Sequence, residues 1–131
     1  MTAYFVDTSA WYELVDAAAP RQAEVTTALA EASTLVTTTF VLHELVALLV
    51  CRGRREAAQL AGARIRRARS VHLVHPDVAE EESAWRLFLE RPDKAYSVTD
   101  CLSFQVMRRL RVEVALATDR HFAQEGFSVI P

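Results

Sequence analysis

Short apolar runs alternate with longer amphipathic segments along most of the chain. Residues 3–6 are continuously apolar, as expected of a strand buried on both faces of a parallel sheet, and residues 34–37 are rich in β-branched side chains, which also favour a strand. The expected strands are residues 3–6, 34–37, 71–74, 114–117 and 127–130. Strands that alternate with helices in this way indicate an α/β fold with a mainly parallel central sheet of about five strands, flanked by helices.

The segments between these runs have helical periodicity and recognisable boundary residues. The expected helices are residues 9–17, 20–32, 39–51, 54–69, 76–90 and 99–110, with a short helical turn over 121–124. Ser9 and Thr38 or Thr39 are suitable N-caps, whereas Pro20 and Pro76 can open helices. Gly53 is expected to end the helix over residues 39–51. In the helix over residues 76–90, Trp85, Phe88 and Leu89 are expected to form one apolar face.

Composition limits the class of protein. With 131 residues and no internal repeat or linker, the chain is expected to form one domain over residues 1–131. A net charge of −2 gives no global signature of nucleic-acid binding, so any such contact must be local. Two cysteines make no disulfide framework, no signal peptide is visible, and no apolar run is long enough to cross a membrane. A cytoplasmic protein is therefore expected.

Four acidic residues stand in or beside apolar segments: Asp7, Glu44, Asp100 and Asp119. An unpaired buried carboxylate costs several kcal/mol, so such a group is normally paired, protonated or bound to a cation. Asp7 and Asp119 follow expected strands, while Glu44 and Asp100 lie near the starts of expected helices. In an open parallel sheet all four positions belong to the carboxyl edge, where ligands bind. The four carboxylates are therefore expected to converge.

Each carboxylate also has an ordinary structural interpretation. Asp7 and Asp119 can cap helices or turns, which is a common use of aspartate. Asp100 follows Ser97 at the spacing of a capping box, which is the better interpretation of Asp100 by itself. Glu44 lies within an apolar helix, where no cap is needed. Its ordinary structural interpretation is a position on a partly exposed edge of that helix. Taken together, the four residues favour a metal site.

Carboxylates without cysteine or histidine ligands favour Mg²⁺ or Mn²⁺ over zinc. A metal of this kind suits hydrolysis of a phosphodiester bond. The adjoining hydroxyls are candidates for orienting the acids or metal-bound water, although capping is an equally good role for each: Thr8, Ser9, Thr99 and Thr118. His43 and His121 neighbour two of the acids, but a packing role is favoured for both.

Arginine supplies nearly all the positive charge, because Lys94 is the only lysine. The arginines form three clusters, for which a solvated helix face is the default interpretation. Arg52, Arg54 and Arg55 follow the helix of Glu44 and are the first candidates for contacts with an RNA backbone. An acidic protein partner is the opposing interpretation, and the sequence does not decide between them.

These residues together resemble the PIN-domain ribonucleases, and within them the VapC-type toxins of bacterial toxin–antitoxin pairs. The resemblance covers essentially the whole chain. Its motifs are residues 5–10 (FVDTSA), the helix of Glu44, residues 96–104 (YSVTDCLSF), and residues 119–122 (DRHF) with Gly126 and Phe127. The first motif alone is weak, whereas all of them in this order are highly specific.

The resemblance implies an endoribonuclease that depends on Mg²⁺ or Mn²⁺ and uses Asp7, Glu44, Asp100 and Asp119. It further implies a homodimer neutralised by a VapB-type antitoxin whose C-terminal segment occupies the acidic groove. One position departs from the family pattern. Many relatives place a hydroxyl two residues before the last acid, where this chain has Ala117 and then Thr118.

Two other classes compete with the toxin hypothesis. One is a catalytically silent PIN-like module that binds protein through its dimer surface, which has no need of four costly carboxylates. The other is a phosphotransfer domain with Asp7 as nucleophile. That class needs a second acid close to the first and a lysine after a later strand, whereas Ser9 and the loop residue Lys94 fit poorly.

Overall fold

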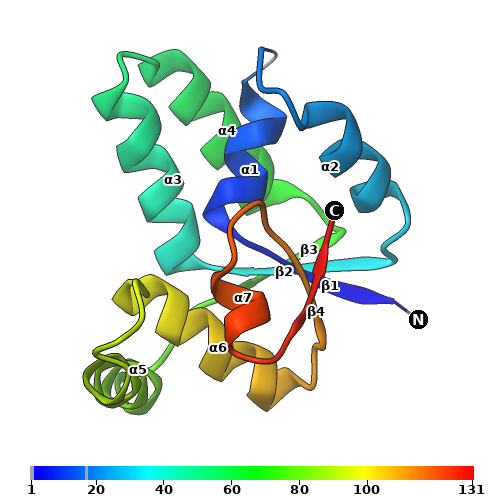
Figure 1. Ribbon diagram of the computed structural model, residues 1–131. Helices are drawn as coiled ribbons and strands as arrows, with labels where there is room; N and C mark the ends of the chain where they lie inside the picture. The colour runs from blue at the N-terminus through cyan, green and yellow to red at the C-terminus, as the bar shows by residue number, and fades with distance from the viewer. Residues whose placement is uncertain (1, 17) are drawn as a thin grey trace.

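The structure is a computed structural model that describes residues 2–16 and 18–131, and it confirms the predicted α/β fold (Figure 1). Within those residues, one five-stranded sheet has the order β3-β2-β1-β4-β5, and every strand pair is parallel. The strands are β1 (Ala3–Val6), β2 (Thr34–Thr38), β3 (Val71–Val74), β4 (Val114–Leu116) and β5 (Ser128–Ile130).

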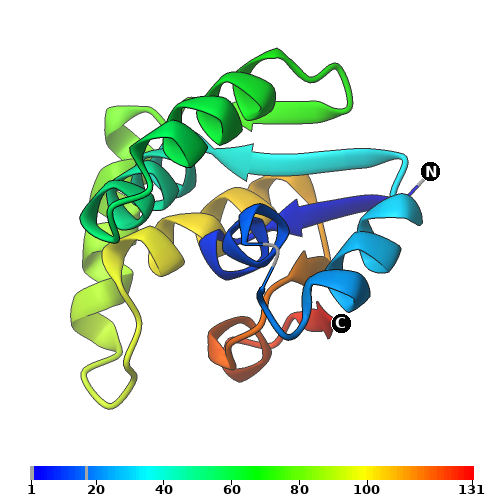
Figure 2. The ribbon, with the colours of Figure 1, turned by 90° about the horizontal axis from the view of Figure 1, so that it is seen from above.

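Helices cover both faces of the sheet. They are α1 (Thr8–Val15), α2 (Gln22–Ala30), α3 (Thr39–Cys51), α4 (Arg55–Arg67), α5 (Val78–Glu90), α6 (Val98–Leu110) and α7 (His121–Gln124). In Figure 1, α1 to α4 lie on one side of the sheet, with α5 and α6 on the other. Figure 2, seen from above, shows β1 and β2 running side by side. No helix in the described part of the chain is long and apolar enough to cross a bilayer.

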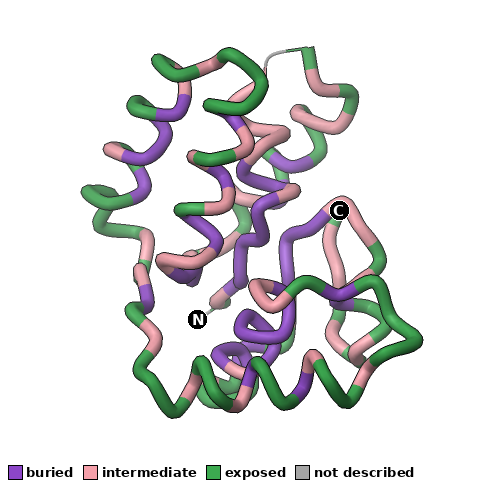
Figure 3. Tube along the Cα trace, turned by 90° about the vertical axis from the view of Figure 1, so that its left-hand side faces the viewer, coloured by how far each residue is buried: buried purple, intermediate pink, exposed green. Residues whose placement is uncertain are grey.

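The core lies between the sheet and the inner faces of the helices, as the buried segments in Figure 3 show. Phe5 and Phe104 are fully buried, and so is Phe122, whose ring packs edge-on against that of Phe104 at 5.1 Å. Phe127 stacks on Phe104 at 5.8 Å. These aromatic contacts join α6, α7 and β1. They consequently hold the segment after β4 against the beginning of α6.

Several helix ends follow the predicted capping chemistry. The side chain of Thr38 accepts a hydrogen bond from the backbone N–H of Val41 and caps α3, as expected. Ser97 and Asp100 form the predicted capping box at the start of α6. Gly53 follows the end of α3 with a φ of +73°, a left-handed conformation that favours glycine.

Other boundaries differ from the prediction. Asp7, not Ser9, caps α1, since its carboxylate accepts the backbone N–H of Ser9. Helix α1 ends at Val15, and residue 17, where the prediction placed its end, lies outside the described residues. Helix α2 begins at Gln22 rather than at Pro20. Helix α5 begins after Asp77, which forms a capping box with Glu80 that the prediction missed.

The apolar face expected on α5 faces outward in part. The residues buried on α5 are Ala84 and Leu87, whereas Trp85 is 49% and Leu89 58% exposed. Trp85 stacks on the half-buried Phe88 at 5.4 Å between ring centroids. The helical period correctly identified an apolar stripe, but most of that stripe is not core. It forms an apolar surface on α5.

Candidate active site

The pairing of β1 with β4 brings two of the predicted acids to one edge of the sheet. Val6 pairs with Leu116, and the backbone N–H of Asp7 donates to the carbonyl oxygen of Leu116 at 3.0 Å. Asp119 follows three residues after Leu116, in the loop before α7. Asp100 lies in the first turn of α6. Three distant segments therefore place Asp7, Asp100 and Asp119 close enough for the charges of the latter two to act on Asp7.

Asp7 is the most deeply buried of these acids, with 3% of its surface exposed. Burial and then the negative charge of Asp119 raise its pKa to about 7, and Asp100 adds to the effect. The hydroxyl of Ser9 donates to Oδ2 of Asp7 at 2.8 Å, which partly opposes that rise. Asp7 thus caps α1 and also lies in a cluster of like charges.

Asp100 is 6% exposed and has two hydrogen-bonding partners. Its Oδ2 accepts the backbone N–H of Ser97 at 3.0 Å and lies 2.8 Å from Nδ1 of His121. Burial raises the pKa of Asp100, while the contacts with Ser97 and His121 oppose that rise. The capping role expected for Asp100 is therefore real. It coexists with a place in the acidic cluster.

Asp119 is the most accessible of the three, with 35% of its side chain exposed. Its Oδ1 accepts the backbone N–H of His121 at 3.1 Å, which forms the turn that starts α7. Its Oδ2 lies 3.8 Å from Nδ1 of His121. Asp119 is consequently oriented by its own loop and keeps one oxygen largely free.

Glu44 is not joined to the other three acids by any direct contact. It is half-buried on α3, which begins directly after β2 at the same edge of the sheet. Among the described residues, its side chain forms no hydrogen bond or ion pair, and its charge is not among the causes of the raised pKa of Asp7 or Asp100. Glu44 therefore lies apart from the tight group of three.

Ser9 is the best placed of the candidate hydroxyls. It donates to Asp7 and accepts the backbone N–H of Thr118 at 3.0 Å, so it ties the end of β1 to the loop that carries Asp119. Thr118 contributes its backbone to this bridge. The Thr8 hydroxyl is buried without a hydrogen-bond partner in the described part of the chain. Thr99 uses its carbonyl oxygen to accept the hydroxyl of Ser103.

His121 is the site residue that the sequence interpretation undervalued. A packing role was favoured for it, and its ring does pack edge-on against Tyr96 at 5.6 Å. However, its Nδ1 also lies within hydrogen-bonding distance of Asp100. The available signal was its position two residues after a candidate acid at the same sheet edge. The contact itself joins α6 to α7, which no local pattern specifies.

Two of the three arginines proposed for RNA contacts have partners within the chain. Arg52 donates to the hydroxyl of Tyr12 at 2.8 Å and lies over its ring. Arg54 donates to the carbonyl oxygen of Val15 and lies 3.9 Å from Asp16. Both hold the end of α1 against the α3–α4 connection. Arg55 is exposed and has no acidic partner among the described residues.

The chemistry of the acidic cluster fits a hard divalent cation. Within the described residues, no lysine or arginine forms an ion pair with Asp7, Asp100 or Asp119, and His121 is their only basic neighbour. In this part of the chain, no group of three or more His, Cys, Asp or Glu side chains is already arranged closely enough to hold a metal ion. The fit therefore rests on oxygen donors whose mutual repulsion a cation would relieve.

Comparisons with known proteins agree with this architecture. The family model for the PIN domain matches residues 4–127. The 23S rRNA-specific endonuclease VapC20 of Mycobacterium tuberculosis is 36% identical over 124 residues, which cover 94% of each chain. The crystal structure of VapC20, described as a sarcin–ricin loop cleaving toxin, superposes with a TM-score of 0.91 at 35% identity and covers 98% of this chain and 99% of that one.

More distant structures share the fold alone. A toxin–antitoxin complex from Klebsiella pneumoniae has a TM-score of 0.67 at 12% identity, covering 98% of this chain and 96% of that chain. PAE2754 from Pyrobaculum aerophilum has a TM-score of 0.64 at 18% identity, with 98% and 88% covered. The family match and the extended identity to VapC20 lead to one conclusion: the chain belongs to the PIN-domain family, among its VapC-type members.

Proposed function

We propose that the protein is a metal-dependent endoribonuclease toxin. The observation that carries this proposal is the convergence of Asp7, Asp100 and Asp119 from three distant segments at one edge of the sheet. A fold gains no stability from placing buried carboxylates together without basic partners. Such an arrangement is instead typical of functional sites, where perturbed pKa values concentrate.

Asp7, Asp100 and Asp119 are the proposed ligands of Mg²⁺ or Mn²⁺, and Glu44 on α3 completes the acidic set. When bound, the metal supplies the Lewis-acid chemistry that hydrolysis of a phosphodiester bond needs. Ser9 fixes the orientation of Asp7, and His121 that of Asp100. Thr8, Thr99 and Thr118 adjoin the acids and are proposed to support them or water beside them.

The proposed substrate is RNA of the large ribosomal subunit. This proposal rests on VapC20, whose name and structural description specify 23S rRNA and the sarcin–ricin loop. The identity of 36% extends over 94% of both chains, so the likeness covers nearly the whole domain. RNA in a large particle also agrees with the open position of Asp119, whose side chain is one-third exposed.

A VapB-type antitoxin is the proposed inhibitor, and the toxin–antitoxin complex from Klebsiella pneumoniae shows that this fold occurs in such complexes. A homodimer in the cytoplasm is also proposed. The apolar surface on α5 supports the dimer, because exposed aromatic and aliphatic side chains that lie together often mark interfaces. The alternative to a toxin is a catalytically silent binding module with the same fold. A test of RNA cleavage distinguishes the two functions.

Cleavage of a 23S rRNA transcript by the purified protein tests the function directly. The wild type is expected to cut in Mg²⁺ or Mn²⁺ but not in EDTA, and Asp100→Asn to lose at least about 99% of the rate, consistent with loss of an essential ligand. Asparagine retains an oxygen that can accept the Ser97 N–H, so this variant should fold. Equal cleavage by Asp100→Asn, or no cleavage by the wild type with either metal, would support the silent module instead.

A further inference from the structure

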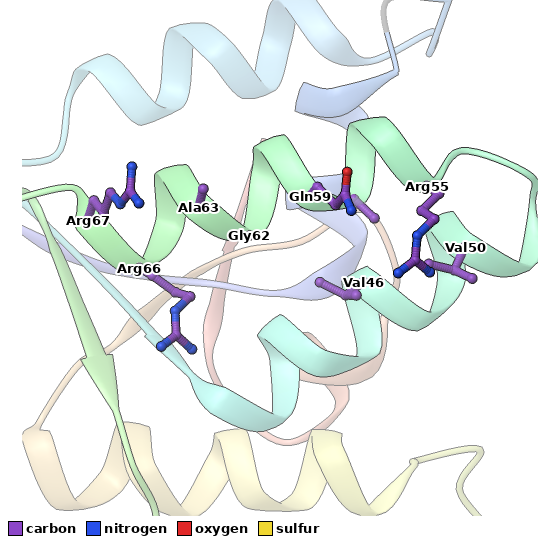
Figure 4. A pocket seen from close by; sticks show the side chains of 9 residues that line it. Val46, Val50, Arg55, Gln59, Gly62, Ala63, Arg66 and Arg67 are labelled. Carbon is purple, nitrogen blue, oxygen red and sulfur yellow. The ribbon is translucent and has the colours of Figure 1, made fainter.

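A groove of about 610 Å³ lies between α3 and α4 (Figure 4), and none of the proposed metal ligands lines it. Val46 and Val50 of α3 form one wall, and α4 supplies the opposite wall. Figure 4 shows Arg55 and Arg66 projecting over the groove from opposite ends of α4. The lining also includes Gln59, Arg67 and the small residues Ala58, Gly62 and Ala63. We name this feature the basic groove.

The positive charge of the basic groove is not neutralised within the described chain. Arg55, Arg66 and Arg67 are exposed, no carboxylate lines the groove, and none of the three forms an ion pair among residues 2–16 and 18–131. Many basic residues elsewhere do have acidic partners: Arg21, Arg54, Arg91, Lys94, Arg108 and Arg109. Helix α4 therefore carries several cationic side chains that have no acidic partner among the described residues.

The spacing of the arginines fits a polyanion. Arg55 and Arg66 are 11 positions apart on one helix, which corresponds to roughly 16 Å along its axis. One strand of a stacked nucleic acid presents about five phosphates over this length, at about 3.4 Å each. Guanidinium groups suit phosphate oxygens because they donate two parallel hydrogen bonds. The two ends of the groove can thus hold separate phosphates of one strand.

A nucleic-acid occupant also resolves an electrostatic difficulty. The protein has a net charge of −2, and its proposed metal site is a cluster of carboxylates that repels RNA when no metal is bound. A local cationic surface is then needed to hold the substrate. Helix α3 connects the two regions, because it starts at the acidic sheet edge, carries Glu44, and then forms a wall of the groove with Val46 and Val50.

We propose that the basic groove binds the phosphate backbone of the RNA substrate through Arg55, Arg66 and Arg67. This inference rests on the proposed function and adds a contact surface outside the metal site. It also revises the set of arginines expected from the sequence. Arg52 and Arg54 are engaged with α1, whereas Arg55 is free and acts with residues from the far end of α4.

Binding of a labelled RNA stem-loop with the sarcin–ricin sequence tests the proposal, by fluorescence anisotropy across a salt series. All proteins carry Asp100→Asn, so that the RNA stays intact. Adding Arg55→Gln with Arg66→Gln is expected to raise Kd about tenfold and to reduce the slope of log Kd against log salt by about 1.5, the loss of two phosphate contacts. Arg64→Gln with Arg69→Gln removes the same charge outside the groove and should leave both quantities near their starting values.

A second variant distinguishes the loss of RNA contacts in the groove from a disruption of α4. Ala63→Glu places a carboxylate in the groove without removing an arginine, and it is expected to weaken RNA binding as well. Unchanged thermal melting of each variant shows that the fold is intact. Groove variants that bind RNA like the matched control overturn the proposal, and loss of antitoxin binding instead would assign the groove to an acidic protein.

Failure of the groove proposal is distinguishable from failure of the proposed function. Cleavage by the wild type depends on the metal site, whereas the salt series measures binding alone. A wild type that cleaves RNA, together with groove variants that bind normally, would reject only the groove. A wild type that cleaves no RNA would reject the proposed function whatever the binding data show.

Discussion

The Nδ1 atom of His121 lies 2.8 Å from Oδ2 of Asp100, so the start of α7 directly contacts the start of α6. The same carboxylate oxygen accepts the backbone N–H of Ser97. With the proton on Nδ1, His121 donates to an ionised Asp100 and restricts its orientation. Asp119 lies beside the same ring nitrogen at 3.8 Å. His121 is therefore a positioning residue for two of the proposed metal ligands.

Replacement of His121 should impair the metal site more than the fold. For His121→Ala we expect a 10- to 100-fold loss, roughly, in Mn²⁺ affinity or RNA cleavage, as is usual when a group that orients a metal ligand is removed. Manganese titration and single-turnover cleavage measure the two effects. His72→Ala removes an exposed histidine on β3 and serves as the control. Wild-type affinity and rate in His121→Ala would show that the contact does not matter.

The raised pKa of Asp7 predicts a dependence of stability on pH. The folded protein holds the Asp7 proton up to a pKa of about 7, compared with 3.8 for the free side chain. The unfolded state thus releases this proton first, so the metal-free protein loses stability as pH rises from about 4 to about 7. At pH 8, Asp7→Asn should be more stable than the wild type by a few kcal/mol.

Thermal or urea unfolding in EDTA at pH 4.5 to 8 measures this effect. The advantage of Asp7→Asn is expected to shrink as the pH falls toward 4, because the wild-type carboxyl is then protonated in the folded state and increasingly protonated in the unfolded state. Added Mg²⁺ should stabilise the wild type and leave Asp7→Asn unchanged. An Asp7→Asn protein that is no more stable than the wild type at pH 8 would contradict the burial and repulsion inferred for this carboxylate.

The bridge through Ser9 gives a prediction that separates two neighbouring hydroxyls. Ser9→Ala removes the hydroxyl that donates to Asp7 and leaves the Thr118 N–H without its acceptor, which should cost about 1 to 3 kcal/mol in unfolding free energy. Thr118→Val should have a much smaller effect, because Thr118 contributes its backbone. Urea unfolding of the two variants checks the difference. Equal destabilisation would assign the bridge to the Thr118 side chain instead.

The proposed homodimer makes the exposed apolar surface on α5 testable. Trp85→Ser with Leu89→Ser should convert the dimer to a monomer, because these side chains are about half exposed in the single chain. Light scattering after gel filtration gives the mass. Leu60→Ser changes an equally exposed leucine on α4 and should leave the dimer intact. A wild type that is monomeric, or a double variant that remains dimeric, would contradict this assignment.

Local sequence patterns predicted most of the sheet and several helix starts. The bounds of β1, β3 and α7 agree with the prediction, because short runs rich in apolar residues and short polar turns are local signals. Thr38 was also correctly identified as a cap. At α1 the predicted N-cap, Ser9, was wrong, because Asp7 lies two residues earlier and is an equally suitable capping residue. The hydrogen bond that the Asp7 N–H donates to the carbonyl oxygen of Leu116 in β4 shows that tertiary pairing also fixes this position.

The capping and functional interpretations of the acids were not exclusive. Asp7 and Asp100 both cap helices, and both lie in the acidic cluster. Parallel topology explains why the two roles coincide, since helix starts and strand ends meet at the same edge. Which side chains contact one another at this edge depends on distances between elements. For that reason His121 was undervalued, and the sequence pattern did not show that the apolar face of α5 is largely exposed.

The converging carboxylates are proposed to form one site for a divalent metal. Calorimetric titration of Mn²⁺ into the wild type, Asp7→Asn and the surface control Asp93→Asn measures this binding without RNA. We expect saturable binding by the wild type and by Asp93→Asn, and loss of most of that affinity in Asp7→Asn, because Asp7 is the buried centre of the cluster. Binding of Mn²⁺ by Asp7→Asn with wild-type affinity, or no binding by the wild type, would contradict it.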